Sequence, residues 1–358
     1  MSTYAADRLG DRVRDAGIDV MLVTSLVNVR YLTGYTGSNG VALLGADTRT
    51  FITDFRYVEQ AAEEVDPTFD RRRSTQHVLE GVKDALPPGE ALLGFEAAHM
   101  SVSEHAQLRE LLPGRIELVA TSGLVEELRA VKRPDEVSAI RASAALADEA
   151  FAELVAGGLT GHTERDLAFK LEYEMRRRGA RAASFEPIVA AGPHGSLPHA
   201  RPRDERVRAG ELVVIDWGAQ LDGYCSDCTR TLATGAIDAE AAEVYQLVLD
   251  AQLAGLDEVK PGAVGHDVDS VPRAAITAAG HGEHFGHGLG HGVGLEVHEA
   301  PRLAQPSDAV LAPGNVVTVE PGIYIPGRFG VRIEDLVVVT DDGAEILTSV
   351  SKELTVVD

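Results

Sequence analysis

Four acidic side chains lie within or at the end of strongly apolar segments of this 358-residue chain. The segments are LVVIDWG with Asp216, GYCSDCTRT with Asp227, VVTVEPG with Glu320 and GVRIEDLVVV with Glu334. A carboxylate in a buried strand needs a partner, because an unpaired charge away from water is costly. Four such charges forced together would also repel one another and raise their own pKa values. The fold must therefore expose these strands or gather the carboxylates around positive charge.

The two aspartates are separated by a predicted hairpin turn at 221–223. Two antiparallel strands joined there would bring both carboxylates to one pair of metal ions. Either aspartate taken alone is explained as well by an edge strand that faces solvent. The choice between these alternatives depends on the other members of the set.

The glycine-rich stretch GHGLGHGVGLEVHE supplies three histidines, His287, His291 and His298. Glycine allows the backbone to approach a site closely, and a tract rich in histidine is typical of metal binding. Four carboxylates and one imidazole make a ligand set for two divalent cations that activate water. Spacing alone leaves open which histidine is the ligand. A phosphate-binding loop is not indicated, because neither a P-loop lysine nor a clear strand–loop–helix context is present.

Arg332 stands two residues before Glu334, so both side chains point to the same face of a strand. Arg332 is therefore predicted to pair with that glutamate or to bind a substrate carboxylate. Asp335 points the other way, and surface salt bridges along an edge strand are expected for it.

The only two cysteines, Cys225 and Cys228, form a C-x-x-C motif. A redox or zinc site would need a different context, because there is no second pair and the motif lies in a predicted strand. Both are predicted to be reduced, with the side chains on opposite faces.

The charge balance excludes some partners. The chain has 33 basic and 56 acidic residues, a net charge of -23, which repels nucleic acid and anionic membrane surfaces. No apolar run reaches the roughly 20 residues of a membrane-spanning helix, and the N-terminal segment lacks the apolar core of a signal peptide. A cytoplasmic location is expected.

The chain length favours about two domains. Residues 1 to about 125 are predicted to form an α/β unit, and a boundary is expected at 130–134, where Pro134 suits the first turn of a helix. The arginines at 71–73 are expected on the solvated surface. The predicted helices and strands of this unit are Asp7–Ala16, Asp19–Thr24, two strands within 29–57, Gln76–Ala85, Ala91–Glu96 and Ile116–Ala120.

After the boundary, the pattern predicts mixed helices and strands without a regular βαβ alternation, which makes the class α+β. The predicted helices are an amphipathic one from Pro134 through Leu154, Thr163–Gly179, Ala239–Val259 and Val264–Gly280. The predicted strands are Phe185–Ala190, Glu211–Trp217, Gly223–Ala233, Val316–Glu320 and Gly330–Thr340.

Together with LPHA around His199, the four phrases resemble the pita-bread-fold metallopeptidases of family M24, in the order that family has. That family includes methionine aminopeptidase, aminopeptidase P, Xaa-Pro dipeptidase (prolidase) and the non-metal enzyme creatinase. RYLTGYTGSNG and TDFRY are similar to the creatinase-type N-terminal domain. The resemblance implies a C-terminal pita-bread catalytic domain at 131–358. A smaller α/β creatinase-type (ribonuclease H-like) domain is expected at 1–130.

The resemblance also assigns roles by motif. His199 and His298 match histidines that contact substrate and the tetrahedral intermediate, and His287 and Arg332 match substrate-binding positions. Glu320 is expected to shuttle a proton as well as to bind metal. The implied metal ligands are Asp216, Asp227, His291, Glu320 and Glu334.

The implied activity is that of a dinuclear-metal exopeptidase that cleaves Xaa-Pro bonds of short proline-containing peptides. Oxygen-rich ligation favours Mn²⁺ and permits Co²⁺ or Zn²⁺. Aminopeptidase P-like activity is preferred, with Xaa-Pro dipeptidase as the alternative. A creatinase-like C–N hydrolase and a non-catalytic binding protein on this fold are less favoured, because the ligand set is complete. A homodimer is expected from relatives with this N-terminal domain.

Overall fold

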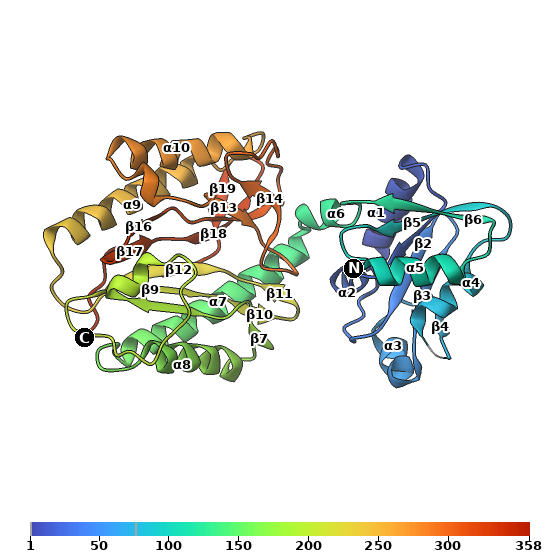
Figure 1. Cartoon of the computed structure of the whole chain (residues 1–358), viewed down its shortest axis with the longest axis horizontal. Coiled ribbons are helices and arrows are strands. Elements are labelled where there is room, and N and C mark those ends of the chain that lie inside the picture. The colour runs from blue at the N-terminus through green and yellow to red at the C-terminus, as the bar shows by residue number, and fades with distance from the viewer. Residues whose placement is uncertain (1, 76) are drawn as a thin grey trace. The chain divides into compact units, whose positions relative to one another are not determined.

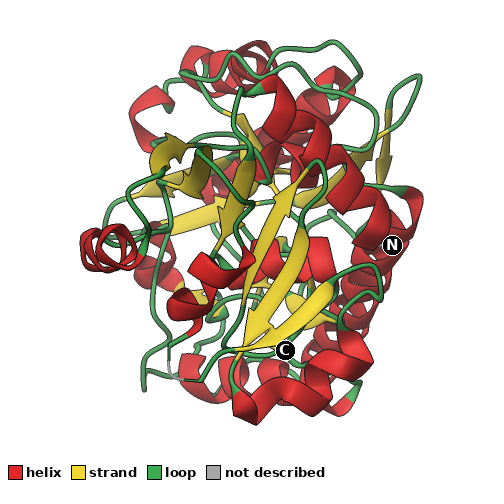
Figure 2. Ribbon diagram, turned by 90° about the vertical axis from the view of Figure 1, so that its right-hand side faces the viewer, coloured by secondary structure: helices red, strands yellow, loops and turns green. Residues whose placement is uncertain are grey.

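The computed structural model describes residues 2–75 and 77–358, and side chains from residue 5 onward. Gln76, the first residue of one predicted helix, lies outside the described residues. The chain separates into two compact units, Met1–Arg129 and Ala130–Asp358, here called the N-terminal and C-terminal units. Both mix helices with strands, so the predicted α+β class is confirmed (Figure 2).

The N-terminal unit is built on one six-stranded sheet in the order β4-β3-β2-β1-β5-β6. Val20 and Leu22 of β1 join an apolar core with α4 and α5 on one face of this sheet, while α1 and α2 contact β2. The strands are β1 (Val20–Val23), β2 (Val41–Gly45), β3 (Arg49–Thr53), β4 (Asp70–Arg73), β5 (Ala91–Glu96) and β6 (Ile116–Thr121). The helices are α1 (Ser2–Asp15), α2 (Leu26–Thr33), α3 (Val58–Glu64), α4 (Val82–Ala85), α5 (Val102–Leu111) and α6 (Glu126–Ala130).

The predicted strands of this unit are confirmed, but its helices were only partly found. The arginines at 71–73 are exposed as expected, although they form the edge strand β4. The predicted helix at 76–85 is a short 3₁₀ turn, Val78–Gly81, followed by α4. The sequence analysis missed α2, α3, α5 and α6, since their short segments carry little of the helical repeat that a prediction needs.

The C-terminal unit places its strands between two pairs of helices (Figure 1). One core joins α7 and α8 to β8, β9 and β12, and another joins α9 and α10 to β15 through β18. The helices are α7 (Pro134–Ala156), α8 (Glu164–Arg177), α9 (Ala239–Glu258) and α10 (Gly265–Ala278). The strands are β7 (Ala182–Ala183), β8 (Ile188–Ala191), β9 (Leu212–Trp217), β10 (Ala219–Leu221), β11 (Tyr224–Cys225), β12 (Cys228–Ala233), β13 (Gly290–Gly292), β14 (Glu299–Leu303), β15 (Val316–Val319), β16 (Gly322–Ile325), β17 (Phe329–Arg332), β18 (Asp335–Val339) and β19 (Ala344–Ile346).

The predicted hairpin turn is confirmed between β10 and β11. Asp222 and Gly223 have φ angles of 48° and 85°, so both central residues of the two-residue turn are left-handed. Such turns match the twist of the flanking strands. Beyond the turn the chain returns as β12, which pairs with β9 and sets Thr229 opposite Asp216.

Two predicted strands are each broken in the structure. The segment 223–233 forms β11 and β12 in different sheets, and the segment 330–340 forms β17 and β18 in different sheets. The continuous strands expected from the sequence were therefore wrong at Asp227 and at Glu334, which lie in the breaks. Glu320 lies in a third break, between β15 and β16. Side chains in a strand point alternately to its two faces, but a residue at a break does not follow this pattern. The three carboxylates at the breaks can therefore point toward one another.

Among the described residues, every helix is too short or too polar to cross a bilayer.

Candidate metal centre

Three of the predicted ligands lie within metal-binding reach of one another. Asp227, His291 and Glu334 each offer a ligand atom, and these atoms lie within 4.8 Å of one another. The Nε2 atom of His291 is also 3.3 Å from Glu320 Oε1 and 3.7 Å from Asp227 Oδ2. Asp216 lies close enough for its charge to raise the pKa of Asp227. The fold therefore brings together all five residues from three strand breaks and two strands.

Thr229 of β12 connects this group. Its hydroxyl donates to Glu334 Oε2 at 2.7 Å and accepts from Arg332 Nε at 3.0 Å. The Glu334 backbone N–H donates to the Thr229 carbonyl at 3.1 Å. Arg332 also donates from Nη2 to Asp216 Oδ2 at 2.6 Å. Two of the carboxylates are thus held in fixed orientations by neutral and cationic donors.

Each of these two carboxylates still has one oxygen without a partner. Asp216 Oδ1 and Glu334 Oε1 are buried, and neither has a hydrogen-bond partner among the described residues. Buried polar atoms are nearly always paired, so such orphans require an explanation. Oxygen atoms aimed at a shared space, beside two more carboxylates and an imidazole, fit divalent cations.

His291 of β13 is also oriented as a metal ligand would be. Its Nδ1 lies 3.1 Å from the Gly292 carbonyl, which only accepts, so Nδ1 carries the proton. In a neutral ring, Nε2 then directs a lone pair toward the carboxylates of Glu320 and Asp227. That arrangement is repulsive unless a cation or a proton lies between them, as in a metal-bound histidine whose other nitrogen donates to a carbonyl.

The pKa values of the carboxylates show that their negative charges are poorly compensated by the protein. Burial, followed by the charges of neighbouring carboxylates, raises the pKa values of Asp227 and Glu334 well above the ordinary range. Burial also raises the pKa of Asp216, opposed by Arg332. Burial alone would raise the pKa of Glu320, but the hydrogen bond and charge of His291 outweigh it and lower that pKa to about 2. A charge that neutralises the whole set would remove this conflict.

A chain of hydrogen bonds runs from Arg332 to His287. Arg332 Nη1 donates to Tyr324 Oη at 2.8 Å, and Tyr324 Oη lies 3.0 Å from His287 Nε2. His287 Nδ1 is 2.8 Å from the Gly288 carbonyl, so Nδ1 donates and the Tyr324 hydroxyl donates to Nε2. Arg332 Nη1 also donates to the Pro198 carbonyl at 3.2 Å. Both predicted substrate-binding residues are thus engaged with protein groups beside the centre.

The two remaining histidines lie on the open side of the centre. His298 is exposed, and its ring lies 4.4 Å from that of His291 in an edge-on arrangement. Burial and the charge of His291 lower the pKa of His298, and the charge of His199 contributes. His199 is exposed and directly follows Pro198, whose carbonyl is bound by Arg332. Among the residues that the structure describes, neither side chain forms a hydrogen bond, so both can contact an incoming molecule.

The prediction for Asp335 was half wrong. Asp335 does point away from Glu334, but it is 1% exposed, on a strand flanked by β15 and β19. It forms buried ion pairs with Arg230 and Lys352. A sequence shows alternation within a strand, but it does not show which strands have neighbours on both sides.

Both cysteines are buried, and neither forms a disulfide. They belong to different apolar cores, and burial raises the pKa of Cys225 to about 11. A thiol that holds its proton so firmly is a poor metal ligand or nucleophile.

Sequence reasoning missed three polar residues of the centre, Thr229, Thr318 and Tyr324. Thr318 accepts from the His291 backbone N–H at 3.1 Å and donates to Glu320 Oε1 at 3.1 Å. The one signal in the sequence was the alternation of side chains along the strand. Thr229 and Thr231 are two residues apart, so they lie on the same face of β12, and both bond Arg332 there.

A second group of possible ligand residues lies in the N-terminal unit: Glu96, His99 and Glu126. Glu96 accepts from the backbone N–H groups of Thr24 and Ser25 at 2.6 Å and 2.8 Å, at the start of α2. Its carboxylate is therefore satisfied as a helix N-terminal partner. This group lacks the orphan oxygens of the centre described above.

Comparison with known proteins places these features in context. The model of metallopeptidase family M24 matches residues 138–341, and the model of the Creatinase/Prolidase N-terminal domain matches residues 6–131. An Xaa-Pro dipeptidase of Pyrococcus furiosus is 36% identical, covering 94% of this chain and 95% of the relative. The solved structure titled Xaa-Pro dipeptidase from Bacillus anthracis is 40% identical with a TM-score of 0.96, covering 100% of both chains. An X-Pro aminopeptidase structure from Thermotoga maritima is 37% identical with a TM-score of 0.89, covering 97% and 100%.

Proposed function

From the premise that this chain belongs to metallopeptidase family M24, we propose that it is an Xaa-Pro dipeptidase with two divalent cations at the centre described above. The orphaned, buried oxygens of Asp216 and Glu334 are the observation that carries the metal part of this proposal. Among the described residues, the positive charge next to this donor set comes from Arg332 and from His291 when it is protonated.

The substrate part rests on the relatives. The sequence analysis preferred aminopeptidase P-like activity, but relatives named Xaa-Pro dipeptidase match nearly the whole chain and support the alternative better. Aminopeptidase activity stays as the second candidate, because the Thermotoga maritima structure carries that title at 37% identity. Both candidates cleave the bond before a proline.

The five predicted ligands would hold the cations, with Mn²⁺ the best match to four carboxylates and one imidazole. When bound, two such cations lower the pKa of a water molecule and polarise the scissile carbonyl. Glu320 lies 3.3 Å from His291 within the donor set, and its carboxylate would also accept and return the proton.

The histidines on the open side would serve the substrate. His298 has a lowered pKa, so it is neutral at pH 7 and offers an N–H to the developing oxyanion without an added charge. His199 approaches the same space from the loop after Pro198. His287, oriented by Tyr324, would line the substrate pocket.

For Arg332 the contacts support a different task from the predicted one. Its donors reach Asp216, Thr229, Tyr324 and the Pro198 carbonyl, and it is 3% exposed. We therefore propose that Arg332 orients Asp216 and the loop that carries His199. Its role in binding a substrate carboxylate stays a prediction from the sequence.

The test compares three peptides with the Mn²⁺-loaded protein: Ala-Pro, Ala-Pro-Ala and Ala-Ala. A dipeptidase cleaves Ala-Pro with a kcat/KM at least about tenfold above that for Ala-Pro-Ala, since each 1.4 kcal/mol of transition-state discrimination is tenfold. The reverse order supports the aminopeptidase, and Ala-Ala is the control for proline specificity. Turnover of neither proline peptide would contradict both candidates. Activity that survives chelation would favour a creatinase-like C–N hydrolase.

The homodimer and the cytoplasmic location stay predictions from the sequence. Light scattering coupled to gel filtration tests the first, with a mass of two 38.1 kDa chains as the expected result.

A further inference from the structure

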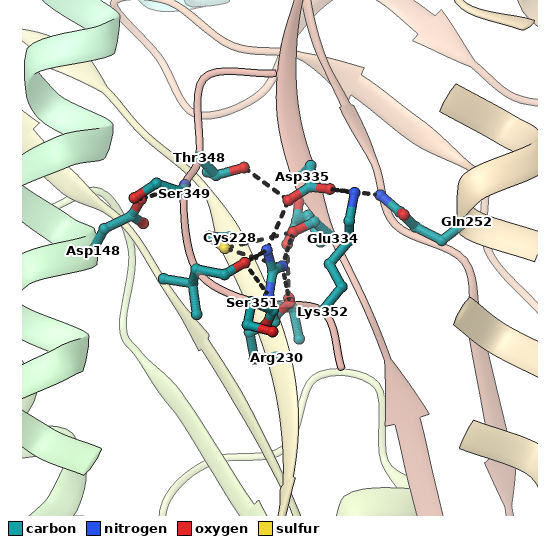
Figure 3. A network of polar contacts seen from close by, with 12 residues as sticks. Asp148, Cys228, Arg230, Gln252, Glu334, Asp335, Thr348, Ser349, Ser351 and Lys352 are labelled. Atoms are coloured by element: carbon teal, nitrogen blue, oxygen red, sulfur yellow. Dashed lines mark hydrogen bonds and ion pairs between the residues drawn. The ribbon is translucent and has the colours of Figure 1, made fainter. Parts of the chain in front are cut away.

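On the far side of β12 and β18 from the metal centre lies a second, fully buried polar group. Thr229 and Glu334 meet through their side chains on the side of the centre, whereas the next residue of each, Arg230 and Asp335, points the opposite way. Arg230 and Asp335 are each 1% exposed, and their side chains are joined by a 2.8 Å bond. The pair thus backs directly onto two residues that shape the centre (Figure 3).

Arg230 binds the backbone of both of these residues. Its Nη1 donates to the Thr229 carbonyl at 2.9 Å and makes a short hydrogen bond to the Glu334 carbonyl. Glu334 lies in the break between β17 and β18. Among the described residues, its carbonyl accepts hydrogen bonds from two side chains, those of Arg230 and Cys228, and from no backbone N–H. The guanidinium of Arg230 therefore supplies the hydrogen bond that a neighbouring strand would otherwise give to the Glu334 carbonyl.

Asp335 fixes the guanidinium in turn. It accepts from Arg230, and also from Thr348 at 2.8 Å, Gln252 at 2.9 Å and Lys352 at 2.7 Å (Figure 3). The remaining donors of Arg230 reach the carbonyls of two residues in the C-terminal segment, Val350 at 2.6 Å and Ser351 at 2.9 Å. The Arg230 side chain is thus bound by residues of β12, β18 and this segment, while Gln252 of α9 binds its partner Asp335.

A buried ion pair is poor evidence for added stability, because apolar residues of similar volume often stabilise a core as well. The ion pair of Arg230 and Asp335 instead fixes the positions of the groups that it binds. Replacing a residue that holds a metal ligand in place typically lowers metal affinity about 10–100-fold. We infer that Arg230 and Asp335 are positioning residues that fix the backbone of Glu334, and so the direction of its carboxylate, for metal binding. This inference rests on the metal centre proposed above.

The test is calorimetric titration of chelator-treated protein with Mn²⁺, together with the unfolding midpoint of each protein in chelator. Arg230→Lys keeps the charge beside Asp335 but loses the planar fork that spans two carbonyls. We expect it to weaken at least one Mn²⁺ binding step about 10–100-fold. Asp335→Asn keeps an acceptor for Arg230 and is expected to give a smaller loss, which serves as the test should Arg230→Lys fail to fold.

Lys352→Met is the matched control. Lys352 binds the same carboxylate, but it is 20% exposed by side chain, and its bond is to Asp335 rather than to the Glu334 carbonyl. It is expected to lower the unfolding midpoint while leaving both Mn²⁺ affinities within about threefold of the wild type. The inference is overturned if folded Arg230→Lys and Asp335→Asn bind Mn²⁺ like the wild type, or if Lys352→Met weakens binding as much as they do. Because no peptide is used, the result is independent of the proposed substrate.

Discussion

At the scale of single residues, the centre is held together in spite of its charges. Asp227 is 5% exposed and has the charges of Glu334, Asp216 and Glu320 around it. Among the described residues, its only ion-pair partner is His291, at 3.7 Å. The site is therefore arranged for binding cations at some cost to the stability of the metal-free protein, as is common where function and stability compete.

Asp227→Asn removes one of these charges with little change in shape. We expect the unfolding midpoint in chelator to rise by about 2–4 °C, equivalent to roughly 1 kcal/mol, because a buried like-charge contact is relieved. The rise on adding Mn²⁺ is expected to shrink or vanish. Scanning calorimetry with and without Mn²⁺ measures both, and a variant that is less stable than the wild type in chelator would contradict this account.

The stability of the metal-free protein should depend on pH in a direction opposite to that of most proteins. Raised folded-state pKa values, as in Asp227 and Glu334, give stability that is complete below the ordinary pKa and lost as pH rises through the folded-state value. For His291, burial would lower the pKa, but Glu320 outweighs it and raises it, so its contribution has the same sign. Glu320 acts the other way at acid pH, since its pKa is about 2. His287 and His298, whose pKa values are lowered by burial, also act the other way as pH falls below the ordinary histidine range.

We therefore expect the free energy of unfolding in chelator to fall as pH rises above the ordinary carboxyl range, toward the raised folded-state pKa values of Asp227 and Glu334. Denaturant titrations at several pH values measure it. In Asp227→Asn the slope should be shallower, and an equal slope in both proteins would show that other groups cause it.

At the scale of elements, the breaks in the strands are what make the centre. The sequence analysis placed Asp227, Glu320 and Glu334 correctly in or beside apolar strands, because hydrophobic pattern is a local property. It did not predict that β11 and β12, or β17 and β18, belong to different sheets, because sheet membership depends on distant partners. The register that sets Thr229 opposite Asp216 is also a tertiary property, although the hairpin turn that leads to it was predictable from Asp222 and Gly223.

Thr229→Val tests the importance of strand β12 in orienting the ligands. It leaves Arg332 Nε and Glu334 Oε2 without their shared partner, which should cost about 1–3 kcal/mol and weaken Mn²⁺ binding about 10–100-fold. Denaturant unfolding and Mn²⁺ titration provide the two readouts.

Thr231→Val is the control on the same face of the same strand. Among the described residues, the Thr231 hydroxyl bonds only the Arg332 backbone, donating to its carbonyl at 2.9 Å and accepting from its N–H at 3.0 Å. It should lose a comparable amount of stability and keep Mn²⁺ affinity. Equal effects of the two substitutions on Mn²⁺ binding would refute a specific role for the Thr229 hydroxyl.

At the scale of the whole molecule, the order of motifs along the chain was more informative than its composition. The family, the α+β class and the five residues that converge could be predicted from that order. Thr318 and Tyr324 could not, because a threonine or tyrosine in an apolar strand carries no mark of its distant partners. The preferred length of the peptide substrate could not be predicted from any single motif either. Relatives that match nearly the whole chain shifted the preference from aminopeptidase to dipeptidase.

The central claim, that five residues form a centre for two cations, is tested most directly by counting metal ions. Protein stripped by chelator, incubated with Mn²⁺ and freed of excess metal is analysed by mass spectrometry for Mn per chain. The account predicts close to two for the wild type and a clear reduction for Asp227→Asn and Glu334→Gln in folded protein. Well under one Mn²⁺ per wild-type chain would contradict it and favour a non-catalytic binding protein on this fold.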